Sequence, residues 1–79
     1  MTLQKVDWIV KYLQDKDARL SDLKEFFKIQ NDDGRVKVKE TSKNEYEYAL
    51  KECKFILELE PLTEPKSHYR VKSISCLRK

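Results

Sequence analysis

The chain is poor in the residues on which many enzyme sites depend. Its 79 residues include one glycine, Gly34, and one histidine, His68. A single glycine cannot build a glycine-rich loop that cradles phosphates. His68 stands between a proline and a strand-like segment, where a solvated loop side chain is a commoner role than general acid–base catalysis. We therefore expect a protein that is not an enzyme and that holds no cofactor.

Cysteine and long apolar runs are also scarce. Cys53 and Cys76 show neither CxxC spacing nor the crowding of a secreted disulfide framework. With His68 they match no zinc pattern, so we expect no metal site and interpret both thiols as small buried apolar groups. No apolar run has the length of a membrane span or a signal peptide core. These absences predict a soluble, intracellular, cytoplasmic protein.

Charge, by contrast, is abundant and unevenly distributed. Apolar and charged residues each make up 39% of the chain, which predicts one small domain over residues 1–79. The net charge is +3; residues 1–34 carry six basic and seven acidic side chains, whereas residues 65–79 carry five basic ones and no acid. A basic C-terminal segment suits a polyanion, although a solvated tail of this composition also favours solubility.

The first apolar pattern predicts a helix from Leu3 to about Gln14. Its core face has helical spacing and consists of Leu3, Val6, Val10 and Leu13, with Ile9 beside them. Trp8 and Tyr12 widen the apolar surface of this helix beyond one core contact. These two side chains either wrap the edge of a small core or contact a partner protein or a second copy.

A second, shorter helix is predicted to begin at Ser21, whose hydroxyl suits an N-cap. Its buried face is Leu23, Phe26 and Phe27, and the two residues before it, 19 and 20, predict a very short extended segment. The polar run at residues 31–34, Asn-Asp-Asp-Gly, predicts a turn.

Basic and β-branched residues alternate after this turn. In a strand, Arg35, Lys37 and Lys39 would share one face. This basic ladder would either contact phosphates or protect an edge strand from aggregation.

A third helix is predicted from about Lys43 to Lys54. Ser42 and Glu45 have the spacing of a capping box at its start. Its core face would be formed by four residues three or four positions apart: Tyr46, Ala49, Leu50 and Cys53.

The period changes to two at Phe55. Residues 55–59 predict a strand, residues 60–68 a polar loop with two prolines, and residues 69–77 a second strand. A phase shift between Val71 and Ile74 indicates a bulge or an edge.

The order of these elements, with Arg-Leu-Ser-Asp-Leu at residues 19–23 and Ala-Leu-Lys-Glu-Cys-Lys-Phe-Ile-Leu at residues 49–57, resembles the winged helix-turn-helix superfamily. The resemblance implies an α+β fold of three helices with a C-terminal β-hairpin wing and, in addition, room for a third short strand. It also implies that the third helix enters the major groove of duplex DNA while the wing contacts the backbone.

On this resemblance the chain is a small DNA-binding protein, a transcriptional regulator or a replication accessory factor, with a nucleoid location and a homodimer as further expectations. The candidate nucleic-acid contacts lie on the third helix (Lys43, Asn44, Tyr48, Lys51), on the wing (Lys66, His68, Arg70, Lys72) and on the basic ladder (Arg35, Lys37, Lys39). Three acids on the third helix, Glu45, Glu47 and Glu52, oppose DNA binding. The alternative is an interaction module of the same fold that docks on a protein through Trp8 and Tyr12 or through these acids.

Overall fold

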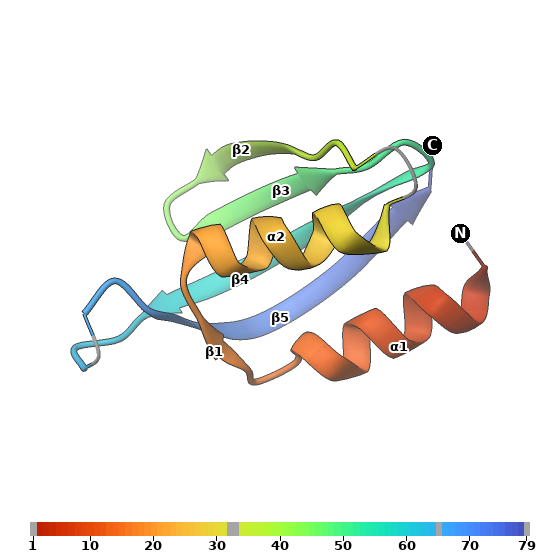
Figure 1. The fold of residues 1–79 in the computed structure, drawn as a ribbon. Helices are drawn as coiled ribbons and strands as arrows, with labels where there is room; N and C mark the ends of the chain where they lie inside the picture. The colour runs from red at the N-terminus through yellow and green to blue at the C-terminus, as the bar shows by residue number, and fades with distance from the viewer. Residues whose placement is uncertain (1, 32–33, 65, 79) are drawn as a thin grey trace.

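Two helices cover one face of a five-stranded antiparallel sheet (Figure 1). The structure is a computed structural model that describes residues 2–31, 34–64 and 66–78. Its elements in chain order are α1 (Leu3–Leu13), β1 (Asp17–Ala18), α2 (Leu20–Gln30), β2 (Lys37–Ser42), β3 (Glu45–Ala49), β4 (Cys53–Pro61) and β5 (Tyr69–Arg78). The strand order β1-β5-β4-β3-β2 makes the last four strands a meander and adds β1 at its far edge.

The predicted three-helix winged-helix fold is wrong. Residues 43–54, expected to be the third helix, form the turn after β2, strand β3, the turn into β4 and the first two residues of β4. Within β3, Tyr46 and Tyr48 point to the helix-covered face while Glu45 and Glu47 point to the other face. Alternating aromatic residues favour a strand. The Tyr48 ring packs 5.0 Å from the Phe27 ring of α2. This core contact stabilises the strand by more free energy than a local capping motif would contribute to a helix.

The capping-box motif serves a hairpin instead of a helix start. Ser42 pairs with Glu45 across a two-residue turn, in which Asn44 has a positive φ of 63°, a conformation that asparagine tolerates better than most residues. The Glu45 carboxylate accepts a hydrogen bond from the Thr41 hydroxyl at 2.9 Å. Side chain and backbone therefore stabilise the reversal of the chain at this point.

The first predicted helix is confirmed, but its core face differs in one position. Ile9 and Leu13 are buried, whereas Leu3 is 73% exposed. The second helix begins at Leu20 rather than after Ser21, with Arg19 as the N-cap residue. The Asp22 carboxylate accepts from the backbone N–H of Arg19 at 3.2 Å. The short extended segment lies at residues 17–18, two positions earlier than predicted.

The predicted strands agree with the structure more closely than the predicted helices do. Strands are observed near each predicted position, and the loop between β4 and β5 runs from residue 62 to 68. Glu58 pairs with Ser73 and Leu59 with Val71, so Lys72 is the extra residue of the predicted bulge. The predicted turn at residues 31–34 lies partly outside the described residues, but Gly34 has a φ of 65° and donates to the carbonyl of Asn31 at 2.9 Å.

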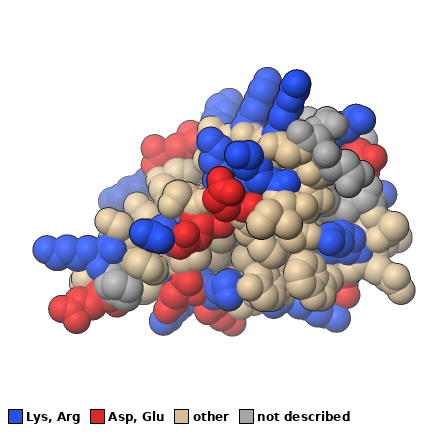
Figure 2. Space-filling model, in the orientation of Figure 1, with Lys and Arg blue, Asp and Glu red and all other residues tan. Residues whose placement is uncertain are grey.

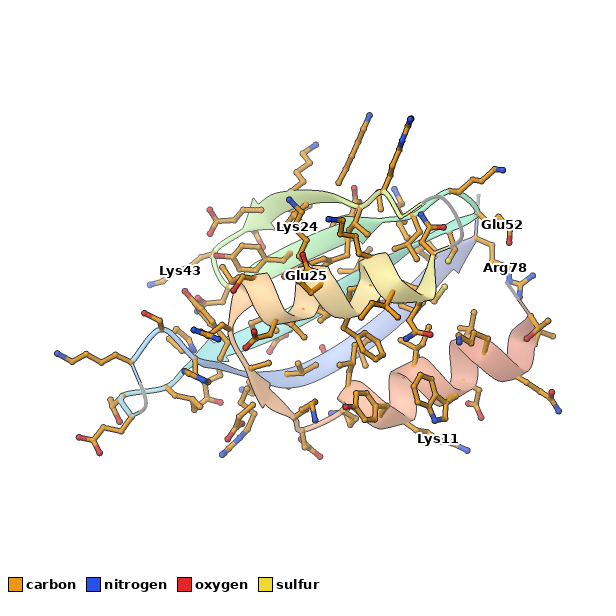
Figure 3. All side chains as sticks on the ribbon, in the orientation of Figure 1. Lys11, Lys24, Glu25, Lys43, Glu52 and Arg78 are labelled. Atoms are coloured by element: carbon orange, nitrogen blue, oxygen red, sulfur yellow. The ribbon has the colours of Figure 1, made fainter. Side chains whose placement is uncertain are left out.

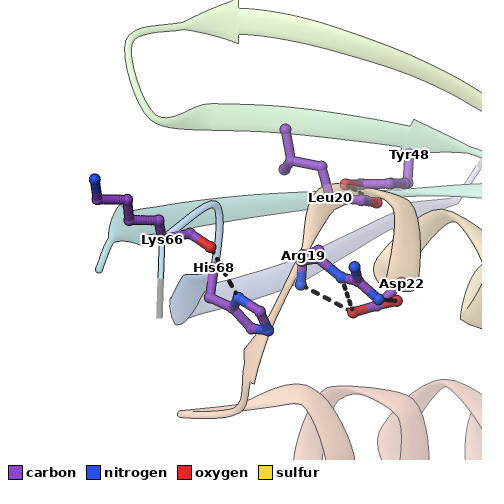
Figure 4. A network of polar contacts seen from close by, with 6 residues as sticks. All are labelled: Arg19, Leu20, Asp22, Tyr48, Lys66 and His68. Carbon is purple, nitrogen blue, oxygen red and sulfur yellow. Dashed lines mark hydrogen bonds and ion pairs between the residues drawn. The ribbon is translucent and has the colours of Figure 1, made fainter. Parts of the chain in front are cut away.

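Phe27 of α2 is the centre of the core. Its ring lies 4.9 Å from that of Phe55 and 5.0 Å from that of Tyr48. The Tyr48 hydroxyl donates to the backbone carbonyl of Leu20 at 3.4 Å (Figure 4), and burial raises the pKa of this phenol. Tyr48 therefore joins the sheet to α2 and is fully buried, although the sequence placed it on a DNA-facing surface.

Candidate nucleic-acid interface

Strand β2 forms one edge of the sheet and is exposed along its whole length. Lys37 pairs with Ala49 and Lys39 with Glu47, which places both lysines on the sheet face that the helices leave uncovered. Arg35 is exposed just before the strand. The basic ladder predicted from the sequence therefore runs along an open edge.

Most described lysines and arginines elsewhere contact an acid or an aromatic ring. Ion pairs join Lys11 to Asp7 (3.1 Å), Arg19 to Asp22 (3.2 Å), Lys28 to Glu25 (3.8 Å) and Lys54 to Glu47 (3.3 Å). Lys5 and Lys16 lie over the rings of Trp8 and Tyr12. Within residues 2–31, 34–64 and 66–78, the cations with no ion pair or ring contact are Lys24, Arg35, Lys37, Lys39, Lys43 and Lys66.

Five of these six described cations border β2. Lys43 lies in the turn that ends β2 (Figure 3). Lys24 lies on the side of α2 that faces β2, because it is about 200° around the helix from Phe26, which stacks on α1. We call Lys24, Arg35, Lys37, Lys39 and Lys43 the β2 cationic edge. Figure 2 shows basic side chains gathered along this edge at the top of the view.

Three acids lie close to the β2 cationic edge. Glu47, opposite Lys39, is bound to Lys54 at 3.3 Å. Glu45, which pairs with Ser42, accepts from the Thr41 hydroxyl at 2.9 Å. Glu40 is exposed on β2 but points to the same face as Tyr46, away from Lys37 and Lys39. None of the three forms an ion pair with a member of the edge among the described residues.

The predicted wing cations Arg70 and Lys72 face acids. Arg70 binds Asp17 through Nε at 2.9 Å and through a terminal nitrogen at 3.3 Å. This hydrogen-bonded pair lowers the pKa of Asp17 and raises that of Arg70. Lys72 Nζ lies 4.0 Å from Glu58 and 3.9 Å from Glu60. The positive charge of this hairpin is therefore largely compensated within the protein.

The remaining predicted contacts are dispersed. Lys66 and His68 lie in the β4–β5 loop, where a ring nitrogen of His68 is 3.3 Å from the Lys66 carbonyl oxygen (Figure 4). Lys43, Asn44 and Lys72 line one shallow depression together with Glu58 and Glu60, among others. Lys51 lies in the β3–β4 turn at the other end of β3. The structure thus brings together the ladder and Lys43, and of the wing residues only Lys72, which faces acids, borders the same depression.

Lys24 was missed by the sequence prediction. Its signal was its position on the second predicted helix, two residues before Phe26 and therefore on the opposite side of that helix. Recognising it required knowing that β2 lies on that side.

The uncovered face of the sheet offers no aromatic platform among the described residues. The register places Tyr46, Tyr48, Phe55 and Tyr69 on the helix-covered face. Successive bases of a single strand usually stack on aromatic side chains. The β2 cationic edge can therefore contact phosphates, but it has no surface on which unpaired bases would stack.

The chain was compared with known protein families, curated proteins and solved structures, and none of them matches it. Among the described residues, neither helix is long and apolar enough to cross a membrane. The same residues contain no group of three or more His, Cys, Asp or Glu side chains suited to a metal ion.

The two cysteines lie close together under the helices. Cys53 is buried. The burial of Cys76 itself and the proximity of Cys53 raise the pKa of the Cys76 thiol to about 11. A shift of about two pKa units lowers the thiolate fraction near neutral pH by about 100-fold. Since the thiolate is the reactive form, we expect iodoacetamide to label Cys76 about 100-fold more slowly than free cysteine at pH 7.5.

Mass spectrometry of timed samples measures this rate at each cysteine, and the denatured chain provides the matched control with a normal thiol. If folded Cys76 were labelled at the rate of the denatured chain, its thiol would not have the raised pKa that burial predicts.

Proposed function

We propose that this protein binds the backbone of duplex nucleic acid, with duplex DNA as the expected ligand, through the β2 cationic edge. The observation that carries the proposal is the concentration of free cations at this edge: of the six described cations that have neither an ion pair nor a ring contact, five border one strand. Phosphates supply the counter-charges that the protein itself does not provide there.

The geometry of the edge favours contact with phosphates over base reading. Alternate residues of a strand are about 7 Å apart, so Lys37 and Lys39 reach along one backbone instead of converging on one base. Flexible lysine side chains act as point charges. Contacts of this kind position a protein on DNA without reading its sequence. Asn44, expected to read an adenine edge, lies in the turn beside Lys43, and its role in sequence preference stays a prediction.

Duplex rather than single-stranded nucleic acid is favoured by the absence of exposed aromatic side chains on the uncovered face in the described residues. A duplex presents its phosphates on a regular outer surface and needs no stacking platform. Regulation of transcription and assistance of replication both fit such a contact, as does a location with the DNA.

A salt titration tests the proposal. If four or five cations each neutralise one phosphate, log K should fall with log salt concentration with a slope of about −3.6 to −4.5. Fluorescence anisotropy with a labelled 20-base-pair duplex of random sequence, between 50 and 200 mM salt, measures the slope.

Lys66→Glu is the control variant for charge reversal at the β2 cationic edge. It reverses one charge in the distant β4–β5 loop, and its salt slope should remain that of the natural chain. A flat salt dependence, or no binding at 50 mM salt, would rule out the proposal.

A further inference from the structure

A second surface lies between the helices, on the side of α2 away from Lys24. Trp8 and Tyr12 of α1 stack at 5.2 Å between ring centroids, and Phe26 of α2 lies 6.0 and 5.2 Å from them. We call these three side chains the aromatic ridge. Trp8 is 48% exposed and Tyr12 is 44% exposed. Figure 2 shows an uncharged surface in this region, below the charged residues of α2.

The aromatic ridge borders a pocket of about 310 Å³ between α1, β1 and α2. Tyr12 and Phe26 line it together with three core residues, Leu13, Ala18 and Leu23. An apolar depression of this volume accepts one side chain of a partner, and ordered aromatic walls are typical of sites that bind with little loss of rotamer freedom.

Two lysines flank the aromatic ridge. Lys5 Nζ lies 5.5 Å from the centre of the Trp8 ring and Lys16 Nζ lies 4.5 Å from that of Tyr12, one at each end. The acids at the pocket, Asp17 and Asp22, are already bonded to arginines.

The nearby Asp7 is likewise paired with Lys11 at 3.1 Å. Lys5 and Lys16 themselves form no ion pair with a described acid, so both ammonium groups are open to a partner.

We propose that the aromatic ridge docks an acidic protein segment that inserts one apolar side chain into the pocket. Carboxylates of the segment would pair with Lys5 and Lys16 while its apolar residue contacts Tyr12 and Phe26. A second copy fits this surface less well: a two-fold interface places the same patch on both subunits, and the lysines of one would then face those of the other.

The proposal is independent of nucleic-acid binding. Lys24 and Phe26 lie on opposite sides of α2, so the β2 cationic edge and the aromatic ridge face different directions. One molecule can hold both ligands, which would make it an adaptor between a duplex and an acidic protein.

Selection of random peptides displayed on phage tests the docking surface. We expect the enriched peptides to combine two or more acidic residues with a large apolar residue. Trp8 is the only tryptophan, so its fluorescence should change when such a peptide is added to the full chain. Lys16→Glu should weaken peptide binding at least tenfold, whereas Lys66→Glu, an equal change of charge in the β4–β5 loop, should leave it unchanged.

Four results would overturn this proposal: no enrichment, enrichment of neutral or basic peptides, unchanged peptide affinity of the Lys16→Glu variant, or self-association that Trp8→Ala abolishes. The last result, measured by sedimentation equilibrium, would assign the ridge to a second copy.

Discussion

Replacing both Lys37 and Lys39 by glutamate is expected to lower the affinity for duplex DNA at least 100-fold at 50 mM salt. Each phosphate contact contributes about one factor of ten to the binding constant at this salt concentration, through counterion release. Losing two contacts should also reduce the magnitude of the salt slope by about two. Anisotropy titrations with the random duplex measure both quantities, and circular dichroism should show an unchanged fold because both side chains are exposed.

The matched control is the double variant Lys11→Glu, Lys66→Glu. It changes the net charge by the same amount at two exposed positions outside the β2 cationic edge. Its salt slope should remain that of the natural chain. An equal loss of affinity and slope in both double variants would show that net charge alone drives binding, and the assignment to β2 would then fail.

Phe27→Ala is expected to lower the free energy of unfolding by about 3–5 kcal/mol. Its ring is fully buried and contacts the rings of Tyr48 and Phe55, so truncation leaves a cavity at the junction of α2 with β3 and β4. A domain of this size has a total stability of about 4–12 kcal/mol, so the loss is a large fraction of it. Urea denaturation followed by circular dichroism measures the change.

Ile29→Ala provides the control on the same helix, since Ile29 is 77% exposed. Its effect on the free energy of unfolding should stay within about 0.5 kcal/mol. Similar effects of the two variants would contradict the position of α2 on the sheet.

The fold was predictable where one pattern dominated a segment. Residues 55–59 follow a period of two, so a strand could be placed there from the sequence, and Phe55, Leu57 and Leu59 on one face of that strand are buried. Residues 43–54 carry two patterns at once. Tyr46, Ala49 and Leu50 have helical spacing, whereas Tyr46 and Tyr48 alternate as in a strand. Only the core contact of Tyr48 with Phe27, distant in sequence, decides between them.

The candidate interface was predictable only where it depends on a local pattern. The alternation of Arg35, Lys37 and Lys39 with valines indicated a basic strand face, and Lys37 and Lys39 do share one face of β2. The compensation of Arg70 by Asp17 could not be foreseen, because these residues are brought together by the pairing of β1 with β5. Charge density along the sequence shows where cations are, but ion pairs between distant segments decide which of them remain available.

The pairing of β1 with β5 also has a consequence for the order of folding. β2 to β5 form a meander of neighbouring hairpins, whose loops are short and close rapidly. Asp17 and Arg70, by contrast, are far apart in the chain, and α1 packs against β5. α1 therefore lacks its packing surface until β5 has been synthesised, whereas α2 can already pack on β3 and β4. We expect α1 to dock late in translation, after β5 has left the ribosome.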